Sequence, residues 1–74
     1  MIKKYAEHSG ILIKKSKNLL GEYIFKVNDG TKTISVKVGK ALFEMYQVNS
    51  KITIGYIGRK LINIRLGILF NDEL

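Results

Sequence analysis

The chain has 74 residues, a net charge of +7 and a pI of about 9.8, with 46% hydrophobic and 26% charged residues. This is the composition of one small folded domain and excludes a disordered chain. Without cysteine and with one histidine, the chain has no disulfide framework, no thiol nucleophile and no multi-histidine zinc cluster. The positive charge favours acidic partners, nucleic acid in particular.

Residues near the N-terminus indicate no membrane or secretory segment. Lys3 and Lys4 are not followed by the apolar run of a signal peptide. The longest apolar runs are three residues, as in Ile11–Ile13, far below the roughly 20 that span a bilayer. We therefore expect a soluble, cytoplasmic protein without a transmembrane segment.

Alternating apolar and polar residues, many of them β-branched, predict a mostly β protein. The five predicted strands are Ser9–Lys15, Glu22–Asn28, Thr31–Val38, Lys51–Ile57 and Leu61–Leu66. One domain then covers residues 1–74, with a core over about 9–66 and flanking tails at 1–8 and 67–74.

The second and third strands form a predicted hairpin. Asp29-Gly30 is a strong signal for a two-residue turn. Pairing outward from this turn sets Phe25 opposite Ile34 and Tyr23 opposite Val36 on an apolar face. The other face is mostly polar and ends with Glu22 opposite Lys37, an attractive pair.

A short helix is predicted between the third and fourth strands. Residues 40–46 are mostly good helix formers without β-branching. Leu42, Met45 and Tyr46 lie on one stripe of this helix. If the five strands close into a barrel, Phe43, Met45 and Tyr46 are the candidates to fill one of its open ends.

The fourth and fifth strands form a second hairpin. A three-residue loop, Gly58–Lys60, pairs Ile54 with Ile64, Tyr56 with Ile62, and Ile52 with Leu66. This register turns Ile57 and Leu61 outward, and Gly55 in mid-strand predicts a bulge or a sharp bend.

The order of three strands, a short helix and two strands resembles the OB-fold, a five-stranded barrel that commonly binds oligonucleotides or oligosaccharides. The resemblance covers about Ser9–Leu66 and rests on element order, because no motif of the cold-shock, S1 or single-strand-binding families is present. The alternative is an SH3- or Sm-like barrel in which residues 1–8 form a leading helix.

The resemblance implies a ligand face on the second and third strands, flanked by the first and last hairpin loops. The candidate nucleic-acid-binding residues on this face and these loops are Lys14, Lys15, Lys17, Lys26, Lys37, Arg59 and Lys60. Lysines also decorate ordinary strand surfaces, so a solvated surface is the competing interpretation.

Few aromatic residues remain to stack on bases. The predicted register buries Tyr23, Phe25 and Tyr56 and leaves Tyr5 and Phe70. Binding of DNA or RNA would therefore depend mainly on phosphates and would be salt-sensitive and weakly specific.

No catalytic or metal site is predicted, and no cofactor. Glu7, His8 and Ser9 are adjacent in sequence, and nothing orients them as a catalytic triad. We interpret His8 as an ordinary polar residue just before the first strand. The chain has no paired carboxylates and no phosphate-binding glycine loop. We expect a binding protein and not an enzyme.

Two other classes of partner compete with nucleic acid. One is another protein or a second copy of the chain. The apolar residues proposed for this interface are Ile57, Leu61, Ile68, Leu69 and Phe70. The weaker alternative is anionic lipid, through lysines at positions 3, 4, 14, 15 and 17, but no amphipathic helix accompanies them.

Overall fold

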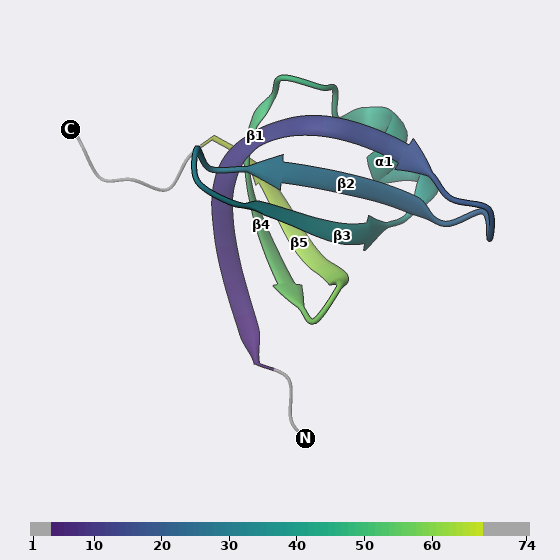
Figure 1. Cartoon of the computed structure of the whole chain (residues 1–74), viewed down its shortest axis with the longest axis horizontal. Helices are drawn as coiled ribbons and strands as arrows, with labels where there is room; N and C mark the ends of the chain where they lie inside the picture. The colour runs from purple at the N-terminus through teal and green to yellow at the C-terminus, as the bar shows by residue number, and fades with distance from the viewer. Residues whose placement is uncertain (1–3, 68–74) are drawn as a thin grey trace.

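The computed structural model describes residues 4–67 and consists of five strands and one short helix (Figure 1). The elements are β1 (Tyr5–Lys17), β2 (Tyr23–Asn28), β3 (Thr33–Val38), α1 (Lys40–Met45), β4 (Lys51–Ile57) and β5 (Lys60–Leu66). The predicted class, all-β with one short helix in the order β-β-β-α-β-β, is confirmed.

The strands close into a barrel in the order β1-β2-β3-β5-β4, with β4 paired back to β1. The long strand β1 arches across the barrel, pairing with β4 through its first half and with β2 through its second (Figure 1). Parallel pairing of β3 with β5 closes the ring, where the Lys37 amide donates to the Arg59 carbonyl at 2.8 Å.

Glycine is required where β1 passes between its two partners. A Cβ at Gly10 would collide with the backbone carbonyl of Asn28, closer than two non-bonded atoms can approach. The absence of a side chain at Gly10 therefore lets β1 press against the end of β2.

The barrel interior holds one apolar cluster. Its fully buried members are Leu12, Phe25, Val27, Val36, Ile52 and Ile54. Helix α1 covers one end, where Phe43 stacks at 6.0 Å from Phe25 and Tyr46 meets it edge-on at 6.5 Å. The prediction that Met45 joins this plug is wrong, because its side chain is 65% exposed.

The β2–β3 hairpin has a four-residue loop, Asp29–Lys32, and not the predicted two-residue turn. The pairing is displaced by two residues, so that Phe25 faces Val36 and not Ile34. A displacement of two leaves every side chain on its predicted face, since side chains alternate with period two. The apolar face was therefore predicted correctly from an incorrect turn.

The β4–β5 hairpin confirms the predicted pairs Ile54 with Ile64 and Ile52 with Leu66. The third pair is wrong, since a register shift between Gly55 and Tyr56 sets Tyr56 opposite Leu61. This irregularity agrees with the predicted bulge at Gly55.

Strand β1 is longer than the predicted Ser9–Lys15, beginning at Tyr5 and ending at Lys17. Residues 5–8 pair with β4, so the leading helix required by the SH3- or Sm-like alternative is not formed there. Strand β4 has its predicted bounds, whereas β2, β3 and β5 differ by one or two residues at their starts.

Candidate nucleic-acid interface

The outer face of β1, β2 and β3 carries a row of cations. Strand register aligns Lys14 of β1 with Lys26 of β2, and Lys37 of β3 with Lys60 of β5. Because Phe25 and Val36 point into the core, their neighbours Lys26 and Lys37 project outward. Four of the seven predicted site residues therefore share one face.

These lysines face like charges across the strands. Such pairs destabilise a sheet unless an anion lies between or above them. Within residues 4–67, Lys14, Lys26 and Lys60 have no acidic partner. The face therefore concentrates positive charge that the described part of the chain leaves uncompensated.

A hollow of about 480 Å³ lies at the end of this face, between the β1–β2 and β4–β5 loops. Its lining consists of Asn18, Glu22, Ile24, Lys37, Ile57, Arg59 and Lys60. Ile24 and Ile57 provide apolar surface, and three cations surround it. This is the arrangement of strands and flanking loops expected from the sequence.

Glu22 is the acidic residue of this lining. Its carboxylate accepts hydrogen bonds from the Asn18 amide at 2.8 Å and from the Lys37 ammonium at 3.1 Å. These two bonds lower the pKa of Glu22 below its ordinary value, so the side chain is charged at neutral pH. The predicted Glu22–Lys37 attraction is confirmed, although it runs diagonally, since Lys37 directly faces Ile24.

Lys15 and Lys17 lie away from this row. Lys15 donates to the Tyr46 carbonyl at 2.8 Å and sits 4.7 Å from the centre of the Phe43 ring. Lys17 lies 5.4 Å from the centre of the Tyr23 ring. Both cations are thus held against aromatic rings near α1, and the predicted seven-residue site divides into two groups.

Aromatic side chains take little part in the hollow. Phe25 is buried, Tyr23 packs at 4.7 Å against Phe43, and Tyr56 contacts the core, as predicted. Tyr5 is partly exposed, but its hydroxyl donates to Glu7 and accepts from Asn63, both at 2.9 Å. Phe70 lies outside the described residues.

The apolar surface predicted for a protein partner is only partly present. Ile57 is exposed and lines the hollow, whereas Leu61 turns inward and packs against the core. The bulge beside Gly55 reverses the two faces there, so that Ile62 is exposed in place of Leu61. Residues 68–70, the remainder of that prediction, lie outside the described part of the chain.

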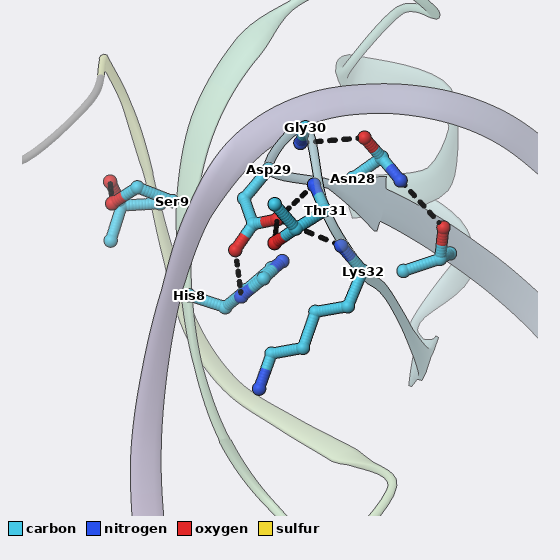
Figure 2. A network of polar contacts seen from close by, with 9 residues as sticks. His8, Ser9, Asn28, Asp29, Gly30, Thr31 and Lys32 are labelled. Atoms are coloured by element: carbon cyan, nitrogen blue, oxygen red, sulfur yellow. Dashed lines mark hydrogen bonds and ion pairs between the residues drawn. The ribbon is translucent and has the colours of Figure 1, made fainter.

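The interpretation of His8 as a polar residue leading into the first strand is wrong, because His8 lies within β1. Its side chain points into the barrel and is only 7% exposed, with Nδ1 3.8 Å from Oδ2 of Asp29 (Figure 2). Asp29 accepts hydrogen bonds from the backbone of Lys32 and Thr31, which lower its pKa. Ser9 points to the other side of β1, so no triad forms (Figure 2).

One signal in the sequence could have found this burial. His8, Gly10 and Leu12 alternate with outward residues, so a longer β1 places His8 on the core face. The His8–Asp29 contact brings the first half of β1 together with the β2–β3 loop.

Neither a metal cluster nor a membrane-spanning helix is found among residues 4–67. No three potential metal-ligating side chains gather there, and α1, with six residues, is far too short to cross a bilayer. Comparison of the chain with protein-family models, with curated proteins and with solved structures finds no match.

Proposed function

We propose that the chain is an OB-like barrel that binds single-stranded DNA or RNA along the outer face of β2 and β3, chiefly through phosphates. The element order and the ring order β1-β2-β3-β5-β4, with a helix before β4, support the OB-like assignment. Barrels of that kind bind oligonucleotides on this face, between the first and last hairpin loops.

The observation that carries the proposal is the juxtaposition of the lysine row with the hollow. Lys26 and Lys14 lie side by side, and the row continues through Lys37 to Lys60 and Arg59 at the rim. A phosphate backbone following these cations would relieve their mutual repulsion. Binding would release the counterions that the phosphates otherwise hold.

The hollow has room for part of a nucleotide but provides little sequence selection. Its apolar surface comes from Ile24 and Ile57, without an aromatic ring among its lining residues. Stacking on aromatic rings is worth about 1–3 kcal/mol per base in other single-strand binders. We therefore expect modest affinity with weak preference among bases.

The experiment is a titration of fluorescently labelled single strands at about 50 and 200 mM salt. Arg59→Glu combined with Lys60→Glu should weaken binding and flatten the salt dependence by about 1.4 in log–log slope, the loss of two single-strand phosphate contacts. Lys32→Glu combined with Lys51→Glu makes the same charge change at exposed positions outside the hollow and is the control.

A binding constant indifferent to salt would contradict phosphate recognition. Equal losses in the two double variants would show that net charge alone attracts the strand, and would contradict a site at the hollow.

A further inference from the structure

The turn between β1 and β2 has a defined shape built by Asn18. Its side-chain oxygen accepts from the amides of Leu20 at 3.0 Å and Glu22 at 2.9 Å. Its own backbone amide donates to the Glu22 carbonyl at 3.0 Å, and Gly21 supplies the positive φ of 84° that closes the turn. The two residues at the tip are therefore held outward.

Those two residues are Leu19 and Leu20, whose relative exposures are 106% and 84%. The next most exposed large apolar side chains among the described residues are Leu66 at 73% and Met45 at 65%, and neither adjoins another such side chain in the sequence. The turn between β1 and β2 projects beyond the sheet (Figure 1). Two adjacent leucines at its tip therefore leave apolar surface in water that the described residues do not cover.

Lysines precede this tip on β1. Lys14 and Lys17 have no acidic partner among the described residues, Lys15 donates to the Tyr46 carbonyl, and Glu22 of the turn is paired with Lys37. Lys14 is exposed, and Lys17 lies along the edge of the turn against Tyr23. Lys4, by contrast, precedes the far end of β1, so the four described lysines predicted to gather at one end form two separate groups, and Lys3 lies outside the described residues.

We propose that this apolar tip inserts into the interfacial region of an anionic lipid bilayer. A convex pair of leucines needs an apolar medium that deforms around it, and a bilayer provides one. The phosphate backbone of a nucleic acid offers no apolar surface to a leucine. Lipid carboxylates and phosphates would lie at the level of Lys14 and Lys17 when the leucines reach the acyl boundary.

This bilayer contact is reversible and depends both on the burial of the leucines and on the attraction of lysines to anionic headgroups. One turn buries little apolar area, so neutral lipid alone should bind weakly, whereas anionic headgroups add attraction to each lysine. The leucines separate this inference from the proposed nucleic-acid site, because Leu19 and Leu20 do not line the hollow, although Asn18 and Glu22 of the same turn do and Lys14 lies in the lysine row.

The test is sedimentation of the full chain with phosphatidylcholine vesicles, with and without about 30% phosphatidylserine. Vesicles containing phosphatidylserine should bind the protein, and the neutral vesicles should bind it at least about tenfold more weakly. Leu19→Ser combined with Leu20→Ser should reduce binding by about tenfold or more. Met45→Ser combined with Ile62→Ser, which also removes two exposed apolar side chains, should leave it unchanged.

Insertion itself can be observed with Leu19→Trp, because the chain has no tryptophan. Its fluorescence should shift to shorter wavelength on anionic vesicles and be quenched by brominated acyl chains, and soluble glycerophosphoserine should cause neither change.

Three results would overturn the proposal. They are a failure to bind anionic vesicles, an unchanged tryptophan spectrum on vesicles that do bind, and equal losses in the two double-serine variants. A tip variant that loses single-strand binding without any vesicle effect would assign the leucines to the nucleic-acid site instead.

Discussion

The two outer faces of the barrel differ in how far their charged side chains are paired within the fold. On the face formed by the first half of β1 with β4 and β5, Arg65 donates to Glu7 at 3.2 Å, and Asn63 and Glu7 both bond to Tyr5. On the face formed by β2 and β3 with the second half of β1, lysines face lysines, and Glu22 pairs with one of them. The charged side chains named on the first face bond to one another, and we call it the paired face. The second, which we call the open face, leaves lysines without an acidic partner and available to a ligand.

The comparison teaches that net charge is a poor guide to a binding surface. What distinguishes the two faces is how far each charge is already paired within the fold. The paired face should respond to substitution through stability, and the open face should respond mainly through binding.

The largest effect is expected at Gly10, where β1 passes from one face to the other. Gly10→Ala would bring a Cβ onto the Asn28 carbonyl, and backbone would have to move to relieve the clash. We expect a loss of about 3 kcal/mol in the free energy of unfolding. Denaturation with urea measures it, and a loss below about 0.5 kcal/mol would show that β1 is not pressed against β2 at this point.

Reversing charge on the open face should produce the next largest effect. Lys26→Glu combined with Lys37→Glu should weaken single-strand binding by about a hundredfold, equivalent to about 2.7 kcal/mol. The matched variant Arg65→Glu combined with Lys51→Glu changes net charge equally on β5 and β4 and should lose less than about fivefold. Thermal unfolding of both variants checks that neither loses its fold.

On the paired face, Gly55→Ala should act through stability alone. The added Cβ would collide with the Tyr5 hydroxyl and the Asn63 amide, which would have to separate. We expect a loss of about 1–2 kcal/mol in the free energy of unfolding, with single-strand binding unchanged. If Gly55→Ala weakened single-strand binding without lowering stability, the two faces would not differ in the way proposed.

The smallest effect concerns pH. Hydrogen bonds to Tyr5 and Arg65 lower the pKa of Glu7, and bonds to Asn18 and Lys37 lower that of Glu22, below the ordinary 4.5 of an unfolded glutamate. Their stabilisation is therefore complete above pH 4.5 and is lost as pH falls through the lower pKa values of the fold. Glu7→Gln combined with Glu22→Gln should reduce the steepness of the melting-temperature decline below pH 4.5, while a steeper decline above that pH would contradict the assignment.

The fold could be predicted because alternation along the strands is strong and survives errors in the turns. Phe25 and Val36 face the core under either loop length, since a displacement by two residues preserves their direction. The bulge beside Gly55 shifts the register by one, and there Leu61 and Ile62 exchanged faces.

The candidate site was predicted only in part for a related reason. Lys26 and Lys37 follow from strand alternation, and Lys17 lies opposite Tyr23 in the strand register, whereas the position of Lys15 depends on the Phe43 ring that α1 brings near. The full exposure of Leu19 and Leu20 depends on the shape that Asn18 imposes on the turn, which local composition does not specify. The alternation pattern therefore does not predict contacts between segments distant in sequence or the conformation of individual turns.

The most direct test of the open face as the nucleic-acid site is a titration of isotope-labelled protein with a short single strand, followed by amide chemical shifts. The account predicts the largest shifts at Ile24, Lys37, Arg59 and Lys60, reduced by added salt, and small shifts at Glu7, Asn63 and Arg65. Shifts concentrated on those last three residues, or no shifts at low salt, would contradict it.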